Sequence, residues 1–301
     1  MNEPLLHGVC PIIATPFDQS GAIDYDSLRN EVRILCEGGC HAVALFGVVS
    51  EFFKLADAER DRLVEVVAAE TDRTDTPLVL SVTHEATTIA VEWAQAYEAA
   101  GADCIMVLPP STLDPPRGEL IDHLTAIADV VTVPVMVQYR PPETPIIPPD
   151  ELARLADETD TIRYFKIECS PAGPYISSLL DAAPDVNVLV GSAGKTMIEA
   201  FDRGACGVIP AAFAWDLYID IFDAYRAGER DRAIELHDRL LPIVNHIGQA
   251  SIPMEKEILA RRGVIADGAT RKPRTGLTDD ALAGLLDHHY ERLKPLLGDP
   301  K

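Results

Sequence analysis

The sequence lacks several features by which broad classes of protein are recognised. Nothing in it approaches the run of about 18 apolar residues that a transmembrane helix needs, so no such helix is expected. Its start, Met1-Asn2-Glu3-Pro4, shows no basic segment followed by an apolar one, so no secretory signal peptide is expected. Neither a P-loop nor a glycine-rich turn after the first apolar run is present, which argues against a doubly wound nucleotide-binding sheet. A cytoplasmic protein is predicted.

Cysteine is sparse, and its spacing does not suggest a metal centre. The six cysteines are scattered, mostly within apolar runs. Cys36 and Cys40 lie four positions apart, but no second pair completes a zinc-binding spacing. Reduced thiols in the core of a cytoplasmic protein are the better interpretation. No bound metal and no cofactor are therefore expected.

Basic residues are also few. Lysine and arginine together number 26 against 48 acidic residues, which gives a net charge of −22. Such a surface repels phosphate groups, so neither nucleic acid nor an anionic membrane is an expected partner. An anionic small molecule would have to bind in a pocket that is locally positive or rich in backbone amides.

Lysine is rare, with seven in 301 residues, and one of them stands in an unusual place. Lys166 lies within Arg163–Glu168, an apolar segment with strand propensity. A strand buried on both faces excludes an ammonium group, because desolvation costs on the order of several kcal/mol unless the group becomes neutral. A neutral amine attacks carbonyl groups, and Tyr139, which ends the preceding apolar run, adds a phenol nearby. This pairing suggests Schiff-base chemistry, whereas the alternative is a lysine that extends to water without a chemical role.

Short apolar runs recur along the first 210 residues, with helical periodicity between them. The eight runs span residues 9–13, 42–46, 78–82, 104–108, 133–137, 162–167, 188–190 and 206–209. Helical stretches include residues 56–70, 88–100, 117–130 and 150–157. This alternation predicts a (β/α)8 TIM barrel, and continuous apolar runs are typical of parallel strands covered on both faces. Because the strand pattern stops near residue 215, we expect a barrel over residues 1–220 and a helical extension over residues 221–301.

The active site of such a barrel lies at the carboxyl ends of its strands. Lys166 and Tyr139 are at such ends, and so are four further segments. These are Gly47–Glu51, Pro109–Ser111, Gly191–Gly194 and Ile209–Pro210. All of them are expected to surround one pocket, so Ser111, Ser192 and Ile209 are candidate substrate contacts.

Six segments of the chain, taken in order, resemble the dihydrodipicolinate synthase and N-acetylneuraminate lyase family of class I aldolases. They are Gly8–Phe17, Gly47–Glu51, Gly101–Asp103, Tyr139–Pro142, Phe165–Lys166 and Gly204–Ile209. Each is weak by itself, but the set is specific in this order on a barrel. The resemblance covers essentially the whole chain and implies a homodimer or a homotetramer.

The resemblance also implies roles for individual residues. Lys166 matches the family lysine that forms a Schiff base with the keto carbon of pyruvate or another 2-oxo acid. Tyr139 matches the tyrosine that relays protons near the imine. The family loop after the second strand binds the substrate carboxylate, largely through backbone amides. Here that loop reads Gly47-Val48-Val49-Ser50, and the amides of Val49 and Ser50 match the binding positions.

Departures from the family pattern bear on the activity. Val48 replaces a threonine of the proton relay, and Ser50 either supplies a hydroxyl instead or caps the following helix. Neither Pro110 nor Ser111 is aromatic, where dihydrodipicolinate synthases carry a second relay tyrosine. Thr144 stands where those synthases carry a carboxylate-binding arginine. These differences argue against a true dihydrodipicolinate synthase.

Two other segments, Ser50–Leu55 and Lys166–Glu168, look more like the branches that act on 2-keto-3-deoxy sugar acids. Glu168 follows the lysine by two positions and shares its face of the strand, where it either directs substrate hydroxyls and protons or pairs with an arginine. We predict a Schiff-base lyase that dehydrates such an acid or cleaves it to pyruvate. The alternatives are a pyruvate-dependent aldolase or synthase of the dihydrodipicolinate synthase type, and a non-catalytic 2-oxo-acid sensor or scaffold.

Overall fold

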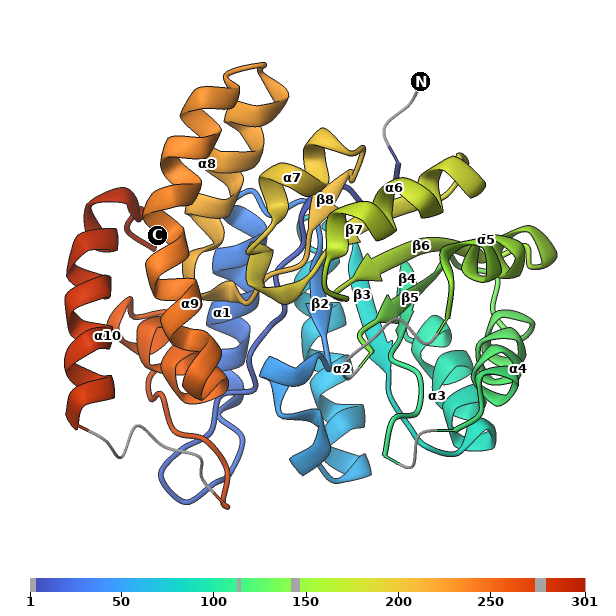
Figure 1. Ribbon diagram of the computed structural model, residues 1–301. Coiled ribbons are helices and arrows are strands. Elements are labelled where there is room, and N and C mark those ends of the chain that lie inside the picture. The colour runs from blue at the N-terminus through green and yellow to red at the C-terminus, as the bar shows by residue number, and fades with distance from the viewer. Residues whose placement is uncertain (1–3, 113–114, 142–146, 274–279, 301) are drawn as a thin grey trace. The chain divides into compact units, whose positions relative to one another are not determined.

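The computed structural model describes residues 4–112, 115–141, 147–273 and 280–300 (Figure 1). The chain divides into two compact units. The first comprises residues 4–7 and 77–209, and the second comprises residues 8–76 and 210–300. The expected separation of a barrel over residues 1–220 from a helical extension over residues 221–301 stays a prediction.

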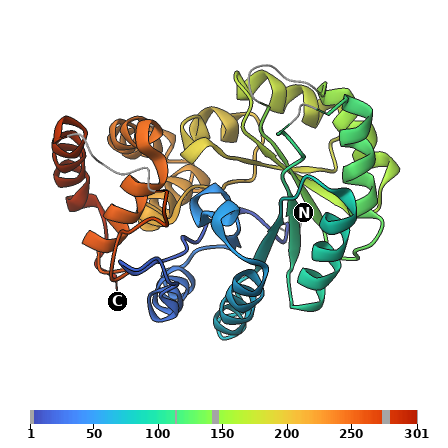
Figure 2. The ribbon, with the colours of Figure 1, turned by 90° about the horizontal axis from the view of Figure 1, so that it is seen from below.

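The first unit is built on parallel strands that pair with their neighbours in chain order. These strands are β3 (Leu78–Val82), β4 (Cys104–Val107), β5 (Val135–Tyr139), β6 (Ile162–Ile167), β7 (Asn187–Val190) and β8 (Gly207–Val208). The connecting helices are α3 (Thr87–Ala99), α4 (Arg117–Ala128), α5 (Pro149–Glu158), α6 (Ala172–Ala182) and α7 (Met197–Asp202). Helices α3 to α6 cover one face of these strands (Figures 1 and 2). Parallel strands require such crossover helices, because a tight turn reverses the chain.

Strand β5 begins and ends two residues later than the apolar pattern predicted. Pro134 has no amide hydrogen for the ladder, so the first donor is the Val135 amide, which bonds the Thr161 carbonyl at 2.8 Å. The pairing with β6 shifts its register between Val135 and Met136, and after the shift Gln138 is the partner of Lys166. This register shift therefore sets which side chain stands beside the lysine.

The second unit combines short strands with long helices. Its elements are β1 (Gly8–Val9), α1 (Tyr25–Glu37), β2 (Val43–Leu45), the 3-10 turns η1 (Val48–Ser50) and η2 (Phe52–Lys54), α2 (Asp57–Thr71), η4 (Ala212–Ala214), α8 (Trp215–Arg226), α9 (Arg230–Arg261), α10 (Asp280–Leu293) and η5 (Lys294–Leu296). Single parallel bridges join Ile12 to Ala44 and to Ala211. Helix α9, orange in Figure 1, packs against α8 and α10.

The strands follow the order β1-β8-β7-β6-β5-β4-β3-β2 in one sheet. Every residue of β3, β4 and β5 is buried, as expected for parallel strands covered on both faces. The strand order and the alternation with helices confirm the predicted (β/α)8 fold class. Over the described residues, no helix is both long enough and apolar enough to cross a membrane.

Candidate active site

Lys166 projects from β6 into the interior of the first unit. Its side chain is buried, with 2% of the residue exposed, and it stands in register between Gln138 of β5 and Leu189 of β7. The nearest charge on its own strand is Glu168, whose Oε1 atom lies 3.8 Å from the Lys166 ammonium nitrogen. In the part of the chain that the structure describes, this is the one ion pair of Lys166. The ammonium is thus buried and held by a single loose contact.

Glu168 is fixed more firmly than the lysine. Its Oε2 accepts a hydrogen bond from Gln138 Nε2 at 2.6 Å, and its Oε1 accepts one from the Ser192 amide at 2.8 Å. Gly191 leaves the room for this arrangement, because a Cβ atom there would collide with the Glu168 carboxyl group. The backbone of Ser192 is in the left-handed region, with φ of 52°, a strained conformation that is typical of functional sites. Three neighbouring strand ends therefore hold one carboxylate beside the lysine.

Several opposing interactions act on the Glu168 carboxylate. Burial raises its pKa, but the positive charge of Lys166 and the hydrogen bonds from Ser192 and Gln138 lower it by more, so that the net pKa lies below the usual value. Arg140 adds a smaller favourable charge. The group is therefore an ionised base at neutral pH. Among the described residues no arginine bonds this carboxylate, and its role towards substrate stays a prediction.

Tyr139 ends β5 and pairs with Ile167, while its neighbour Gln138 pairs with Lys166. Successive side chains of a strand point to opposite faces, so Tyr139 faces away from the side that Gln138 shares with Lys166. The Tyr139 hydroxyl donates to the Ile147 carbonyl at 3.0 Å and accepts from the Ile147 amide at 2.8 Å. Its ring stacks on Tyr175 of α6, with centroids 5.1 Å apart. These contacts hold the Tyr139 hydroxyl at Ile147, just before α5, and the expected proton relay through Tyr139 stays a prediction.

Gln138 is the residue that sequence reasoning missed. It occupies the place beside Lys166 that the prediction gave to Tyr139, and it is 3% exposed. A usable signal was present, because a buried glutamine one position before the tyrosine interrupts an otherwise apolar strand. The pairing with β6, whose register shifts by one residue between Val135 and Met136, is a tertiary feature that the apolar pattern does not show.

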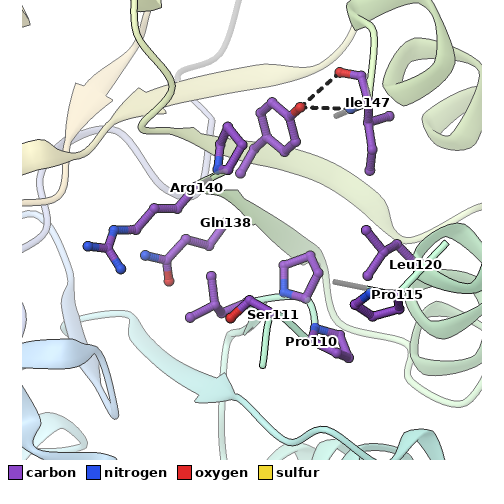
Figure 3. A pocket seen from close by; sticks show the side chains of 11 residues that line it. Pro110, Ser111, Pro115, Leu120, Gln138, Arg140 and Ile147 are labelled. Atoms are coloured by element: carbon purple, nitrogen blue, oxygen red, sulfur yellow. Dashed lines mark hydrogen bonds between the residues drawn. The ribbon is translucent and has the colours of Figure 1, made fainter. Parts of the chain in front are cut away.

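A pocket of about 460 Å³, including its open mouth, lies beside Gln138 at the ends of β4 and β5 (Figure 3). Prolines and leucines form most of its wall, while Gln138, Arg140 and Ser111 supply polar groups. Ser111 is exposed, and its amide approaches the Glu85 carboxylate at 3.5 Å. Arg140 and Gln138 both extend from the end of β5 in Figure 3. The predicted position of Ser111 at a pocket is thereby accounted for, whereas its contact with substrate stays a prediction.

Ser192 and Ile209 were also predicted to contact substrate. Ser192 contributes its amide to Glu168, as described above, and its exposed side chain makes no hydrogen bond among the described residues. Ile209 is 2% exposed, and its amide bonds the Val190 carbonyl at 2.9 Å. Thr144 lies outside the described residues. Among the described side chains, no group of three histidine, cysteine, aspartate or glutamate residues is arranged to hold a metal ion.

The loop that follows β2 belongs to the second unit and is sharply turned. Phe46 and Glu51 both adopt the left-handed conformation, with φ of 66° and 51°. Gly47 fits against Ile12, where a Cβ atom would clash with the isoleucine side chain. Within turn η1 the Ser50 amide bonds the Gly47 carbonyl at 3.0 Å, and the Glu51 amide bonds the Val48 carbonyl at 3.0 Å. Neither of these two hydrogen bonds of the turn uses the Val48 or the Val49 amide.

Ser50 has a structural role that differs from both sequence alternatives. It is fully buried, its hydroxyl donates to the Ile13 carbonyl at 2.6 Å, and the Phe46 amide donates to that hydroxyl at 3.1 Å. The hydroxyl is thus neither a helix cap nor open to a ligand. The Ser50 amide is also bonded within the turn. Among the described residues, the amides of this turn that make no backbone hydrogen bond are those of Val48 and Val49, whereas the prediction named Val49 and Ser50.

Comparisons with known proteins agree with this architecture. The model of the dihydrodipicolinate synthetase family matches residues 5–288. An L-2-keto-3-deoxyarabonate dehydratase of Azospirillum brasilense is 27% identical, over 98% of this chain and 97% of that protein. A 4-hydroxy-tetrahydrodipicolinate synthase of Methanothrix thermoacetophila is 28% identical, over 98% of this chain and 99% of that protein. The crystal structure of a dihydrodipicolinate synthase from Rhodopseudomonas palustris superimposes with a TM-score of 0.88 at 24% identity, covering 97% and 99% of the two chains.

The family match spans nearly all of the chain, and the similar crystal structure shares the whole barrel. The family match confirms the predicted family and, with it, an enzyme of the lyase class related to class I aldolases. The chain therefore belongs to the dihydrodipicolinate synthetase family.

Proposed function

We propose that this protein is a lyase that forms a Schiff base between Lys166 and a 2-oxo acid, and that the substrate is a 2-keto-3-deoxy sugar acid. The observation that carries the proposal is the buried Lys166 ammonium with the Glu168 carboxylate 3.8 Å away. Transfer of one proton within this pair yields the neutral amine that attacks a ketone. Attack at C2 gives a carbinolamine. Glu168 returns the proton to the carbinolamine hydroxyl, which leaves as water, so that the iminium ion forms and Glu168 is a carboxylate again.

The iminium withdraws electrons from C3, which makes the C3 proton acidic. Glu168 is the base within reach: its carboxylate takes the C3 proton, and the C3–H electrons form the enamine. The enamine electrons then expel the C4 hydroxyl, which leaves as water with the proton that Glu168 gained. The product is a conjugated iminium, and its hydrolysis releases the dehydrated 2-oxo acid and restores Lys166. One water is lost from the substrate overall.

Retro-aldol cleavage is the alternative outcome at the same iminium. There a base removes the C4 hydroxyl proton, the C3–C4 bond breaks, and pyruvate remains on Lys166 as the enamine. The Gln138–Glu168 arrangement favours dehydration in our proposal, because Glu168 lies beside Lys166, close to the C2 carbon that the lysine binds. No phenol shares the lysine face of β5 in the described chain to act on a more distant hydroxyl.

The sugar-acid substrate rests on the similar dehydratase of Azospirillum brasilense, whose name gives that reaction. The polar groups of the pocket, Gln138, Arg140 and Ser111, suit the hydroxyl groups of such a chain. We retain the loop Gly47–Ser50 as the expected site for the substrate carboxylate. The second candidate is a pyruvate-dependent aldolase or synthase, which the similar synthase of Methanothrix thermoacetophila favours. A non-catalytic 2-oxo-acid sensor is the third.

Borohydride trapping tests the proposal. The protein is incubated with pyruvate, 2-keto-3-deoxy-arabonate or 2-keto-3-deoxy-gluconate, reduced, and analysed by intact and peptide mass spectrometry. We expect an adduct on the Lys166 peptide that is absent from Lys166→Ala and present in Lys294→Ala, which removes a lysine of turn η5. Turnover of the sugar acid is expected to fall by at least about a thousandfold in Lys166→Ala.

The adduct mass separates the candidates. Loss of water from a trapped sugar acid supports a dehydratase, whereas a pyruvate adduct formed from a sugar acid supports an aldolase. An adduct with pyruvate but no turnover of any sugar acid or aldehyde would favour the sensor. Absence of an adduct with every 2-oxo acid would overturn the Schiff-base mechanism. The predicted homodimer or homotetramer is a separate proposal, for which light scattering gives the mass in solution.

A further inference from the structure

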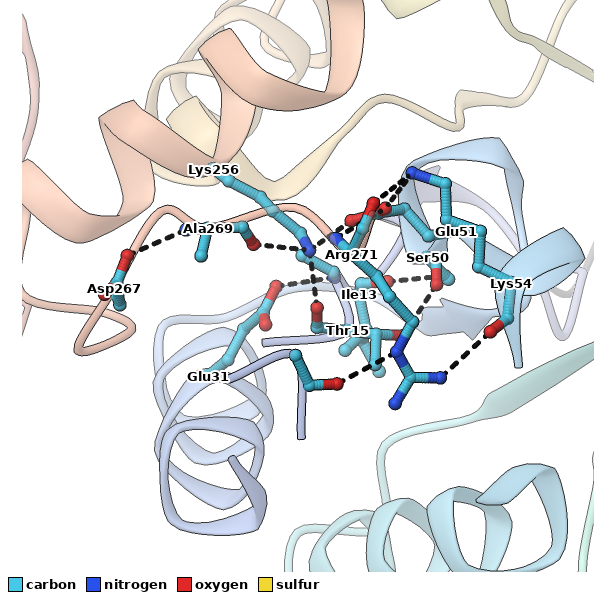
Figure 4. Close-up of polar contacts among 12 residues, drawn as sticks. Ile13, Thr15, Glu31, Ser50, Glu51, Lys54, Lys256, Asp267, Ala269 and Arg271 are labelled. Atoms are coloured by element: carbon cyan, nitrogen blue, oxygen red, sulfur yellow. Dashed lines mark hydrogen bonds and ion pairs between the residues drawn. The ribbon is translucent and has the colours of Figure 1, made fainter. Parts of the chain in front are cut away.

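A second buried lysine, Lys256, lies at the centre of a polar cluster in the second unit (Figure 4). It extends from α9, is completely buried, and donates three hydrogen bonds. The acceptors are Glu51 Oε1 at 2.5 Å, the Thr15 carbonyl at 2.6 Å and the Ala269 carbonyl at 3.2 Å. The ammonium also lies 4.4 Å from the centre of the Phe17 ring. All of its hydrogen-bonding capacity is therefore used inside the protein.

Two of these acceptors lead directly to the loop Gly47–Glu51. Glu51 is the residue that ends the loop in the left-handed conformation, and its carboxylate is completely buried. Thr15 accepts from Lys256 through its carbonyl and donates its hydroxyl to the Ser50 carbonyl at 2.7 Å. A residue other than glycine keeps a left-handed conformation only where its surroundings hold it. Lys256 therefore supports this end of the loop through two contacts, one with the Glu51 carboxylate and one with the Thr15 carbonyl.

A second buried carboxyl group near Lys256 does not replace Glu51 as its partner. Glu31 is fully buried, and burial raises its pKa to about 8 despite the positive charge of Lys256. It accepts a hydrogen bond from the Ala14 amide at 2.9 Å, and its other oxygen has no partner among the described residues. Glu31 is thus largely protonated at neutral pH. The positive charge of Lys256 is balanced by Glu51, so the ammonium and the loop are directly coupled.

Glu51 has two further partners, which lie nearer the surface. Lys54 donates to Glu51 Oε2 at 2.8 Å, and the Arg271 amide donates to the same atom at 3.2 Å. Neither of them reaches Thr15 or the Oε1 atom. Lys54 is therefore a matched comparison for Lys256. It bonds the same carboxylate, but it takes no part in the hydrogen bond that joins α9 to the loop.

We propose that Lys256 is a positioning residue of the active site, which fixes the loop Gly47–Glu51 in the shape that presents the Val48 and Val49 amides to the carboxylate of a 2-oxo acid. This inference rests on the proposed function, because it takes that loop as the carboxylate site. Lys256 touches no reacting atom in this role. It acts through Glu51 and Thr15, and it makes the C-terminal helix α9 a structural part of substrate binding.

The test compares Lys256→Met, Lys54→Met and Arg261→Met, the last of which removes an exposed charge from the same helix. The pyruvate concentration that gives half-maximal borohydride trapping on Lys166 is measured for each, together with the maximal trapped fraction. We expect Lys256→Met to raise the half-maximal concentration at least tenfold with an unchanged maximum. Lys54→Met is expected to change it by less than threefold, and Arg261→Met not at all. Hydrogen exchange of the Val48–Lys54 amides is expected to speed up in Lys256→Met alone.

Lys256→Met leaves an unpaired buried carboxylate and could fail to fold, so the double variant Lys256→Met/Glu51→Gln is made beside it. The double variant is expected to show the same rise as the single one, because both remove one contact. A folded Lys256→Met or double variant with wild-type half-maximal trapping overturns the inference, and failure of both to fold assigns Lys256 a purely structural role. If wild-type protein traps no 2-oxo acid, the proposed function fails instead, and the exchange measurement still reports whether Lys256 holds the loop.

Discussion

Lys166 and Lys256 are both buried against a glutamate, yet they are bonded in opposite ways. Lys256 donates to Glu51 and to two backbone carbonyls, so each of its three ammonium hydrogens has an acceptor. Lys166 has one charged partner among the described residues, Glu168, at 3.8 Å. Around Lys166 it is the glutamate that is saturated, by Gln138 and Ser192.

The difference matches the two proposals, which give Lys256 a structural role and Lys166 a chemical one. Deprotonation of Lys256 would leave at least one of its three acceptors without a donor, at a cost on the order of 1.5–3 kcal/mol for each charged bond lost. Lys166 has no such set of hydrogen bonds among the described residues. Removal of one partner from either buried pair still leaves an unpaired charge, at a cost of about 3–5 kcal/mol. We therefore expect variants of the two pairs to differ more in catalytic activity than in the free energy of unfolding.

Glu168→Gln tests the difference between the two pairs most directly and is expected to have the largest effect. The amide keeps the shape of the side chain but cannot take a proton, so kcat is expected to fall by about 10²–10⁴-fold. Trapping of pyruvate on Lys166 is expected to slow as well, because Glu168 also accepts the ammonium proton before the amine attacks. Steady-state kinetics and borohydride trapping measure the two effects, and Glu158→Gln, at the exposed end of α5, is the control. Wild-type kcat in Glu168→Gln would remove Glu168 from the mechanism.

Gln138→Leu is expected to have the next largest effect and to shift a pH profile. The Gln138 hydrogen bond lowers the pKa of Glu168, so its loss raises that pKa. Activity that needs ionised Glu168 then fails at a higher pH as the solution is acidified. We expect the acid limb of kcat/KM to move to higher pH, because the charged form of Glu168 loses a hydrogen bond that stabilises it. An unmoved acid limb would show that Gln138 does not tune Glu168.

Glu31→Gln tests the second unit through the pH dependence of stability. Burial raises the Glu31 pKa from 4.5 to about 8, so the native state holds a proton that the unfolded state has lost between these values. Stability therefore falls as pH rises through this window, by up to about 1.4 kcal/mol per pH unit from this group. The variant should lose that part of the slope. Urea unfolding at several pH values measures it, and Glu255, with a pKa raised to about 7, continues to contribute below that pH.

Tyr139→Phe is expected to have the smallest effect on catalysis. It removes the two hydrogen bonds to Ile147, so we expect a loss of about 1–2 kcal/mol in stability and a change in kcat of less than about threefold. Tyr175→Phe, which also loses a bond to the Ile147 carbonyl, serves as the matched variant. A hundredfold loss of kcat in Tyr139→Phe alone would support the proton relay through Tyr139 that the sequence indicated.

The strands were predictable because each is a continuous apolar run, and most lie within two residues of their predicted positions. Strand β5 begins two residues later than predicted, because Pro134 has no amide hydrogen. The one-residue register shift between Val135 and Met136 matters more, because without it the pairing of Val135 with Ile162 would continue to Tyr139 opposite Lys166. With the shift, Gln138 stands opposite Lys166, and no count of apolar residues along one strand predicts this.

The sequence by itself determined the barrel and the family, and it singled out Lys166 as the candidate nucleophile, because periodicity and a misplaced ammonium are local signals. Only the tertiary structure decided what surrounds that lysine. Gln138 and Ser192 reach Glu168 from neighbouring strands, and Lys256 reaches Glu51 from a helix 205 positions away in the chain. Such contacts depend on register and packing between elements, which one-dimensional patterns do not encode.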